Sequence, residues 1–577
     1  MTGAGSAASL GRGGRADELP AADIAMARAE WQDVVFARRP RRLALLQLQA
    51  PWPLRRIRIS VLRNHAVETT MSVLRGFLAY AGYEPEWALS AYDDALTFPP
   101  DVEADVHVVW VDISRYSTDG GRDTAAWFAQ RLSALRRDLR GPIIVMDAPP
   151  DVQIADHFNA MLNVEAARLP DVHVFPLSTL AERIGPDVSE GRASEIGTRI
   201  SGTGAAVIAQ HLGLQWIPAV LRPRLKTIIV DLDNTLIGGV LAEDGVQGVD
   251  IAGGYAGLRE LLLALQAGGL LLALVSKNDP RDVERLFTER SSLRALRSAF
   301  VAVEAGWRAK AESVAITLAH LGFGTDSALI VDDNPGEIAA MAAALGDPWF
   351  VLARDPDATM RALHLHPGLL ALRKDELAPS RGADLVAAER RSAEASTAPD
   401  PRVYVASLQV RVDLRMNPAA DRSRLSELSR KTNQFNTTLR WFSEVDVDEY
   451  LRSADRCVVS VRLRDRLSDS GTIAAIFARR ASNAAVIDEI AVSCRALGRA
   501  LEPIILAEVL DRIAGHLEVG RLQVPFVAGP RNSPARAWVD EATVLLGDGS
   551  REVASLSILR TIARSLPVEL CWEDDGV

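Results

Sequence analysis

The sequence predicts a multi-domain α/β protein, and three observations support that prediction. From residue 56 onward, apolar β-branched runs alternate with amphipathic stretches, which is the order of elements in doubly wound parallel sheets. Several of these runs end in carboxylate residues, as strands do where they open onto a crevice. After residue 402 consecutive strand-like runs lead into one amphipathic helix, which indicates an α+β domain.

Length and composition set limits on the class of protein. The 577 residues are enough for three or four domains, and 48% hydrophobic and 24% charged content is typical of globular proteins. A net charge of −10 gives no reason to expect a nucleic-acid partner. The three cysteines form neither a disulfide framework nor a zinc-binding spacing. Without a signal-peptide core or an apolar run long enough to cross a bilayer, we expect a cytoplasmic protein with no membrane partner.

Shifts in composition predict the domain boundaries. The expected parts are a disordered and helical extension at residues 1–50, an α/β domain at 51–222, a second α/β domain at 223–373, a linker at 374–401 and an α+β domain at 402–577. In the first α/β domain we expect strands at residues 56–62, 106–112, 142–148 and 172–177, with helices between them. In the α+β domain we expect a strand-like run at 403–414, a helix at 421–430 and a meander of antiparallel strands.

The stretch TIIVDLDNTLIGGV, residues 227–240, carries the clearest indication of chemistry. A buried-strand pattern ends in Asp231 and Asp233, and the alternation of side chains turns both toward one side. Two carboxylates in that arrangement could hold Mg²⁺. Asp231 is then the expected nucleophile toward a phosphoryl group, and Asp233 the acid–base partner.

Three further motifs follow in order. Ser276 ends the apolar run LLLALVS, Lys310 closes GWRAK, and Asp332 and Asp333 follow the run SALIV. Acidic caps on helices would explain any one of these motifs but not all four in sequence. Together they resemble the haloacid-dehalogenase superfamily of phosphoryl-transfer enzymes.

That resemblance implies roles for individual residues. It implies Mg²⁺ held by Asp231, Asp332 and the backbone carbonyl of Asp233, and a phosphoryl group held by Ser276 and Lys310. Thr235 belongs to the same phosphate-binding loop, where it more readily shapes the backbone than reacts. Asp333 and Glu337 fit two interpretations, as a second metal ligand and a group that orients Lys310, or as acids that begin a helix. The spacing between the motifs leaves no room for a cap domain, so we expect a capless Rossmannoid fold.

Longer phrases narrow the resemblance. DLDNTLIGGVLAEDG, SKND, DDNPGE, KTNQFN and SCRALGR resemble the FkbH-like branch of the superfamily over most of the chain from residue 55. Members of that branch load a glyceryl unit from 1,3-bisphosphoglycerate onto an acyl carrier protein in polyketide pathways, with loss of phosphate. Ile237 departs from the branch, which usually has Trp there.

In that branch the first α/β domain resembles an SGNH-hydrolase domain. An esterase of that type needs a Ser nucleophile after the first strand and an Asp–x–x–His pair near the end of the domain. The chain has neither, and its residues at predicted strand ends are Asn64, His65, Asp112 and Asp147. We therefore expect this domain to be non-catalytic.

The carboxyl-terminal domain contains a second candidate site. Arg495, Gly498 and Ala500, between a predicted strand and a helix, resemble the pyrophosphate-binding loop of GNAT acyltransferases. The phosphopantetheine of coenzyme A or of a carrier protein would fit such a loop. Cys494 lies at its entrance, where a helix N-terminus and an arginine favour the thiolate, so it could carry the glyceryl group; it could equally be a small buried residue. Asn433, Gln434 and Asn436 could bind glyceryl hydroxyls or cap backbone groups.

These expectations combine into one leading function. The chain would remove phosphate from a phosphoglyceryl donor at Asp231 with Mg²⁺, and would transfer the glyceryl unit through Cys494 to the phosphopantetheine of an acyl carrier protein. One alternative is a phosphatase or an acyltransferase with a different donor, in another secondary-metabolite or surface-glycan pathway. A non-catalytic docking protein of an assembly line is the other alternative. Because carrier proteins are typically acidic, a carrier partner also requires a local basic patch on this acidic chain.

Overall fold

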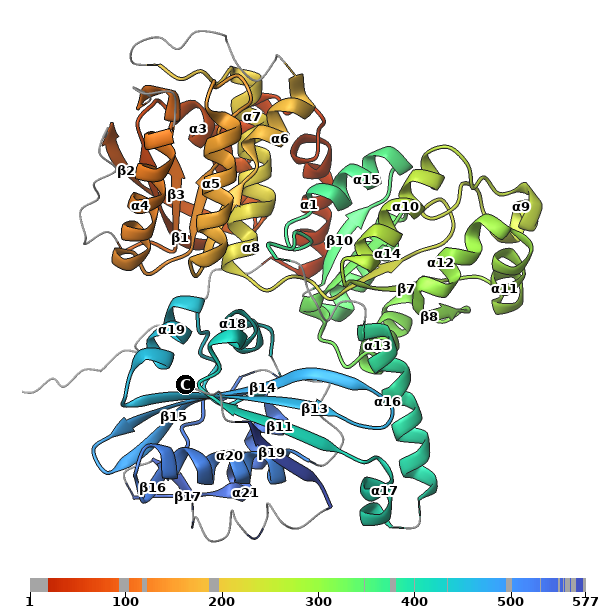
Figure 1. Ribbon diagram of the computed structural model, residues 1–577. Helices are drawn as coiled ribbons and strands as arrows, with labels where there is room; N and C mark the ends of the chain where they lie inside the picture. Colours follow the sequence, from red (N-terminus) through yellow and green to blue (C-terminus); the bar gives the residue numbers. More distant parts are fainter. Residues whose placement is uncertain are drawn as a thin grey trace, which may run out of the picture.

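The computed structural model has three sheets, each with its own helices (Figure 1). It describes residues 19–92, 103–116, 122–185, 197–346, 348–373, 380–398, 400–432, 434–493, 501–529, 531–547, 550–553, 555, 561 and 567–573. Two sheets are parallel and the third is mixed, which confirms the predicted multi-domain α/β class.

The first sheet is parallel and has the strand order β2-β1-β3-β4-β5. Its strands are β1 (Arg55–Arg63), β2 (Tyr83–Tyr92), β3 (Val106–Trp110), β4 (Ile143–Met146) and β5 (Val172–Phe175). Helices α3 (Glu68–Tyr80) and α7 (Gly202–His211) pack on one face, and α4 (Arg122–Asp138) and α5 (Ala155–Arg168) on the other. The prediction missed β2, in which Pro85 interrupts the strand pattern; the position is tolerated because β2 is an edge strand.

The chain leaves this sheet through one long helical stretch, Gly202–Leu221. It contains α7, a π-helical turn at Leu212–Trp216 and α8 (Ile217–Leu221). By length and composition it could cross a membrane, but 83% of its apolar window is buried inside the protein. Burial against the first sheet therefore accounts for its apolar composition.

The second sheet has the order β10-β9-β6-β7-β8 and is also parallel. Its strands are β6 (Thr227–Val230), β7 (Leu271–Ser276), β8 (Phe300–Ala305), β9 (Ala328–Asp332) and β10 (Trp349–Leu352). Helices α10 (Gly254–Ala267) and α11 (Pro280–Glu289) cover one face, and α13 (Lys310–His320) and α14 (Pro335–Leu345) the other. The central strand β6 lies between β7 and β9, so the residues after β6 are flanked on both sides.

The amino-terminal helix α1 (Ala21–Val35) joins the first two units. It packs against α14 of the second unit, while Trp31 and Val35 belong to a core cluster that spans both sheets. The Arg28 guanidinium lies 4.2 Å from the Trp349 ring centroid and 5.1 Å from that of Trp52. The first two units are therefore held together by one continuous apolar core.

The third sheet is mixed, with the order β17-β18-β16-β15-β14-β13-β11-β19 and β12 paired to β15. Its strands are β11 (Arg411–Met416), β12 (Phe435–Asn436), β13 (Arg456–Arg464), β14 (Asp469–Ala481), β15 (Ala484–Val492), β16 (Arg521–Gln523), β17 (Thr543–Leu545), β18 (Arg551–Val553) and β19 (Glu569–Glu573). Helices α18 (Arg422–Lys431) and α19 (Glu444–Arg452) pack on one face, and α20 (Glu502–His516) and α21 (Ser533–Ala542) on the other. In Figure 1, α18 and α19 face the first two units.

One predicted strand is wrong in its first half. Residues Pro401–Ser407 form helix α17, and only Arg411–Met416 is a strand. Pro401 at the first helical position and the Asp400 side chain, which accepts a hydrogen bond from the Arg402 backbone N–H at 2.8 Å, begin the helix. The preceding residues form a separate helix, α16 (Ser380–Thr397).

Buried histidines make the fold sensitive to acid. Burial lowers the pKa of His65, His107, His173 and His211 from 6.5 to about 4. Between these two values the unfolded chain binds protons that the folded chain excludes, so stability falls as the pH decreases from 6.5 toward 4. Each group contributes on the order of 1–3 kcal/mol to this loss.

We predict that His107→Gln flattens the dependence of the melting temperature on pH between 7 and 4.5. Whatever its effect at pH 7, the variant lacks one group that must take up a proton on unfolding. The matched control is His157→Gln, because His157 is exposed and its ring is in water in both states. Thermal melts by circular dichroism measure the slope. Equal slopes in the wild type and His107→Gln would contradict the prediction.

Candidate functional site

Two adjacent strands bring carboxylates to the same edge of the second sheet. Asp231 is the first residue after β6, and Asp332 is the last residue of β9. The strands pair in parallel with Val230 opposite Val331, and the Asp231 N–H donates to the Val331 carbonyl at 2.9 Å. Because carboxyl ends of parallel strands meet at one edge, residues about 100 positions apart in the sequence become neighbours.

Lys310 bridges these two carboxylates. It is the first residue of α13, and its Nζ lies 2.9 Å from Asp231 Oδ1 and 2.5 Å from Asp332 Oδ2. All three side chains are buried, with relative exposures of 6%, 1% and 6% for Asp231, Asp332 and Lys310. A buried cation shared by two carboxylates offsets part of their desolvation.

The cluster fits a divalent cation. Single carboxylate oxygens of Asp231, Asp332 and Asp333 lie within 4.8 Å of one another. Three carboxylates and one ammonium leave two negative charges, which is the charge that one Mg²⁺ would neutralise. Carboxylate oxygens are also the hard ligands that Mg²⁺ prefers. The predicted metal residues Asp231 and Asp332 are therefore together, with Asp333 beside them.

The excess of negative charge appears in the pKa values. Burial raises the pKa of Asp231 to about 7 against the attraction of Lys310, and the nearby Asp332 adds to the rise. Burial likewise raises the pKa of Asp332 and Asp333. Burial alone would lower the pKa of Lys310, but the two carboxylates raise it, so the lysine is a cation. The single positive charge of Lys310 therefore does not balance the negative charge of the three carboxylates.

Asp233 does not point into this carboxylate cluster. Its Oδ1 accepts a hydrogen bond from the Leu241 backbone N–H at 2.9 Å, and its Oδ2 accepts one from Asn278 Nδ2 at 2.7 Å. The same Nδ2 lies 2.8 Å from Ser276 Oγ. Asn278, which is 1% exposed, therefore links the predicted acid–base residue to the predicted phosphate-binding serine. Asn278 belongs to the phrase SKND, whose sequence context alone predicts no role for this residue.

The loop after β6 has a strained, glycine-dependent turn. Asn234 has a left-handed backbone with φ 51°, and its side chain accepts a hydrogen bond from the Gly239 N–H at 3.1 Å. Gly239 has φ 97°, and a Cβ there would collide with the Asp244 carboxylate. Thr235 is buried, and its Oγ1 has no hydrogen-bond partner among the described residues. An anion held by this loop would supply the missing partner.

Two residues near the cluster have partners of their own. Glu337 binds Lys277, with Nζ and Oε1 2.5 Å apart, which favours its interpretation as an acid that begins α14 over that of a group that orients Lys310. Ile237, where the sequence departs from the FkbH-like phrase, is fully buried in the core.

No cap domain is inserted between the motifs, as their spacing predicts. Within residues 197–346, all of which are described, helices α9 (Leu241–Gly248), α10, α11 and α12 (Arg294–Ala299) fill the intervals, and none forms a separate cap. Trp307, three residues before Lys310, is 72% exposed. A large exposed aromatic ring is available as a contact surface.

The predicted site in the third unit lies mostly outside the described residues. This applies to Cys494, Arg495, Gly498, Ala500 and Asn433. Of the amide cluster, Gln434 Nε2 donates to the Gly322 carbonyl at 3.4 Å, and Asn436 Nδ2 donates to the Thr432 carbonyl at 2.9 Å. Both amides therefore hold backbone groups, which was one of the two interpretations left open.

The segment around Asn436 covers one edge of β15. Phe435 and Asn436 pair with Val492 and Ala491. Further along, the buried Glu489 carboxylate accepts hydrogen bonds from the backbone N–H and the hydroxyl group of both Thr437 and Thr438. It also accepts hydrogen bonds from the backbone N–H groups of Arg440 and Ile490. This edge of β15 is therefore not open to a ligand.

The strand-end residues of the first unit hold backbone groups instead of forming a catalytic set. Asn64 exchanges hydrogen bonds with the Asp112 backbone at 3.0 and 2.7 Å. Asp147 accepts from the N–H and hydroxyl of Ser178 at 2.7 and 2.5 Å. His65 Nδ1 contacts the carbonyl of the residue that follows it. Among the described residues, no hydrogen bond joins a serine side chain to His65.

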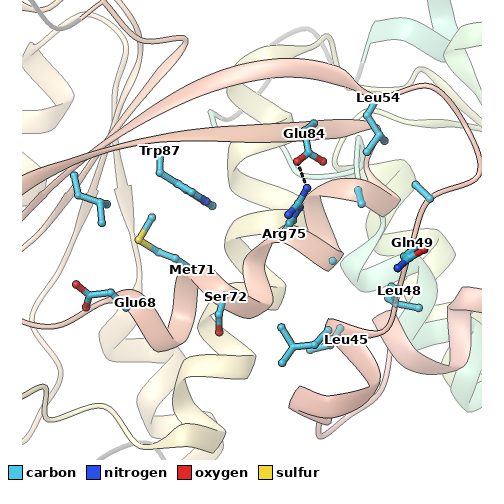
Figure 2. Close-up of a pocket in the computed structure, with 15 residues that line it drawn as sticks. Leu45, Leu48, Gln49, Leu54, Glu68, Met71, Ser72, Arg75, Glu84 and Trp87 are labelled. Atoms are coloured by element: carbon cyan, nitrogen blue, oxygen red, sulfur yellow. Dashed lines mark hydrogen bonds and ion pairs between the residues drawn. The ribbon is translucent and has the colours of Figure 1, made fainter.

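The first unit also has a cavity of about 750 Å³ between α2 (Arg42–Leu46), α3 and β2 (Figure 2). Its walls are mainly apolar, and Figure 2 shows Met71 and Trp87 on one side. The polar pair Arg75 and Glu84 is joined in an ion pair. The cavity holds no cluster of groups suited to bond-breaking chemistry, so the carboxylate edge of the second sheet is the candidate reaction centre.

Comparisons with known proteins give limited similarity. No protein-family model matches the sequence, and no curated protein matches it. The N-terminal part of BF1531 from Bacteroides fragilis, which contains a phosphatase domain complexed with Mg, aligns with 60% of this chain and 99% of its own at 17% identity and a TM-score of 0.46.

Two acetyltransferases are also similar in part. The ribosomal-protein-S18-alanine N-acetyltransferase from Escherichia coli covers 24% of this chain and 88% of its own, at 12% identity and a TM-score of 0.19. Aminoglycoside acetyltransferase AAC(6')-Ib, in complex with coenzyme A, covers 26% of this chain and 98% of its own, at 16% identity and a TM-score of 0.19. At these levels of similarity, the chemistry of this chain must be argued from its own side chains.

We predict that Mg²⁺ raises the melting temperature of the wild-type chain and that Asp332→Asn loses most of this effect. Binding to the folded state alone stabilises it by about 2.7 kcal/mol at a hundredfold excess over Kd. Removal of one of the three carboxylates weakens that binding. Differential scanning fluorimetry with and without Mg²⁺ measures the shift, with Glu312→Gln, an exposed acid on α13, as the control. An equal shift in Asp332→Asn would place the metal elsewhere.

Proposed function

We propose that the second unit is a Mg²⁺-dependent phosphoryl-transfer site that removes phosphate from a phosphoglyceryl donor. The observation that carries this proposal is the buried cluster of Asp231, Asp332, Asp333 and Lys310, which lacks two positive charges. A docking protein without catalysis has no need of such a cluster, because buried carboxylates are costly unless they bind something. The absence of an inserted cap and the exposed Trp307, three residues before Lys310, support a substrate that enters from solvent.

The side chains can divide the chemistry as follows. Bound Mg²⁺ would be held by Asp231, Asp332 and Asp333 and would screen the negative charge of an incoming phosphoryl group. An oxygen of Asp231 attacks phosphorus in line, and the bond from phosphorus to the substrate oxygen breaks. Lys310 and Ser276 hold the phosphoryl oxygens during the transfer.

Asp233 completes the cycle. It gives a proton to the leaving oxygen, then takes a proton from the water that hydrolyses the aspartyl phosphate and releases inorganic phosphate. Asn278 joins its carboxylate to Ser276, so the carboxylate is held beside the predicted phosphate-binding serine, where it can transfer protons. Asp231 and Asp233 therefore have different tasks because they have different partners.

The fuller proposal includes acyl transfer by the third unit. The Cys494 thiolate attacks the acyl carbon of 1,3-bisphosphoglycerate, the bond to the acyl phosphate oxygen breaks, and phosphate leaves. This step gives a 3-phosphoglyceryl thioester, and hydrolysis of its phosphoester at the Asp231 site leaves a glyceryl thioester. The glyceryl group then passes to the phosphopantetheine thiol of an acyl carrier protein, in the cytoplasm, as part of a polyketide pathway, and the Cys494 thiolate is released. The resemblance of the sequence to the FkbH-like branch supports this part of the proposal.

One observation favours a second candidate function. Because Phe435, Asn436 and the residues after them cover an edge of β15, a pantetheine arm could not lie along that edge. A phosphatase without acyl transfer, or with a different donor, would not need that edge. The acyl-transfer readout below separates the two functions.

We predict that Asp231→Asn abolishes Mg²⁺-dependent phosphate release and leaves the fold intact. The amide keeps the shape of the side chain but is a poor nucleophile, and Lys310 retains Asp332 as a partner. A coupled colorimetric phosphate assay with 1,3-bisphosphoglycerate measures release, and circular dichroism checks the fold. The control is Asp326→Asn, an acid outside the crevice that binds Arg531. Wild-type rates in Asp231→Asn would remove this residue from the role of nucleophile.

We predict that a phosphopantetheinylated acyl carrier protein gains one glyceryl unit when incubated with the enzyme, Mg²⁺ and 1,3-bisphosphoglycerate. Intact-mass spectrometry of the carrier measures the gain. Cys494→Ala should lose the gain and keep phosphate release at Asp231, whereas Cys457→Ala, a change at a buried cysteine of β13, should keep both. Phosphate release without any change in carrier mass would support the second candidate function.

A further inference from the structure

A second cleft, separate from the carboxylate cluster, lies where the three units meet. It has a volume of about 580 Å³ and is lined from the first unit by His173, from the segment before β6 by Arg222, and from the third unit by Arg430 and Thr472. Arg222 precedes the amino end of β6, whereas Asp231 follows its carboxyl end. The two sites are therefore at opposite ends of the second sheet.

The cleft has an excess of positive charge. Seven arginine or lysine side chains line it against four carboxylates. The protein as a whole has a net charge of −10, so this concentration of cations is local. In a cleft with low-dielectric walls such an excess attracts anions more strongly than it would on an open surface.

The carboxylates of the cleft are already engaged. Glu427 binds both Arg424 and Lys431, which hold its pKa at about 2 despite burial. Glu444 binds Arg373 at 2.7 Å, and Asp171 accepts the Glu444 backbone N–H at 2.6 Å. Each of these acids therefore already has a polar partner within the cleft.

Two arginines of the cleft have carbonyl groups as their hydrogen-bond partners, and the Arg222 guanidinium also lies 4.7 Å from the Trp349 ring centroid. Arg430 Nη2 donates to the Val220 carbonyl at 2.9 Å, and Arg222 Nη2 donates to the Pro367 carbonyl at 2.5 Å. Within the described residues neither guanidinium has a carboxylate within ion-pair distance. Each guanidinium has five N–H donors, so one carbonyl leaves most of them available to a ligand. Planar guanidinium groups are well suited to phosphate oxygens.

His173 adds a neutral donor to the same cleft. It belongs to β5, and burial lowers its pKa to about 4, with Arg373 acting in the same direction. It is therefore uncharged at neutral pH and adds no repulsion to a nearby guanidinium. One ring N–H can donate to an anion without a further charge to desolvate.

The cleft also adjoins the start of the predicted acyl-transfer loop. Gly471 and Thr472 line it, and the carbonyl of the next residue, Ile473, accepts a hydrogen bond from the Ser493 N–H at 2.7 Å. Ser493 directly precedes Cys494 in the sequence. A phosphate group bound in the cleft would thus lie near the point where the chain enters that loop.

We propose that the cleft between the three units is a binding site for a phosphate ester, with Arg430 and Arg222 as its charged donors and His173 as a neutral one. If the protein has the proposed function, the ester is the phosphodiester of a carrier protein's phosphopantetheine arm. This identification of the ester rests on the proposed function. The cleft then supplies the local basic patch that docking of an acidic carrier to this acidic chain requires. A free small phosphate ester presents the same chemistry.

The first test uses inorganic phosphate and the full chain in EDTA, where Mg²⁺-dependent binding at the carboxylate cluster is absent. We expect saturable binding by isothermal titration calorimetry, at least tenfold weaker in Arg430→Gln and partly restored in Arg430→Lys. The control, Arg452→Gln, changes an arginine of α19 with an 80% exposed side chain and should bind phosphate normally. Circular dichroism melts in phosphate-free buffer establish that each variant is folded. Undiminished binding in a folded Arg430→Gln overturns the proposal.

The second test distinguishes the two sources. Affinities of the wild type for a phosphopantetheinylated carrier protein and for its apo form are compared by biolayer interferometry. We expect the phosphopantetheinylated form to bind at least tenfold more tightly, and the difference to disappear in Arg430→Gln. Equal binding of the two forms overturns the carrier as the source and assigns the cleft to a free phosphate ester. Neither test measures phosphate release, so failure of the Asp231 chemistry would be seen separately.

Discussion

The structure of the second unit depends on a charge imbalance at the carboxyl ends of β6 and β9. Asp231 and Asp332 are buried side by side with one cation, Lys310, between them. Such an arrangement costs free energy in the absence of further positive charge, because buried carboxylates lose their hydration. The parallel pairing of two apolar strands, both buried between helices, places the two carboxylates side by side at their carboxyl ends. The buried carboxylates thus lower the free energy of unfolding at the place where a metal and a phosphoryl group would be bound.

The three units are joined in two different ways. The first two share one apolar core, and α1 lies across their junction. The third unit meets them through hydrogen bonds and ion pairs, such as the Asp171 contact with the start of α19 and the Arg373–Glu444 pair. Polar interfaces between domains of one chain are more easily rearranged than apolar ones. The cleft with excess positive charge lies at this polar junction, so an anion bound there would contact all three units.

Much of the fold and of the candidate site could be predicted from local pattern. Apolar β-branched runs ending in Asp231, Ser276 and Asp332 predict strands with functional residues at their ends, and each run is a strand. The prediction missed β2 because edge strands are half-exposed and can contain proline, as β2 does at Pro85. It placed residues 403–407 in a strand, although they belong to helix α17, because alternating Val and Tyr residues fit either type of element until the helix cap at Asp400 is considered.

The sequence by itself determined which residues could do the chemistry, since the order of the four motifs and the strands before them depend on neighbours in the chain. Only the tertiary structure decided how those residues divide the work. Asp231 and Asp233 are two residues apart, a spacing that would turn both side chains to the same side of a strand. In the structure Asp231 faces Lys310, whereas Asp233 faces Asn278. The cleft could not be predicted either, because Arg222 and Arg430 are some 200 residues apart and meet only when the three units pack together. Local sequence specifies strands, helices and their ends, whereas charge balance is a property of groups that folding brings into contact.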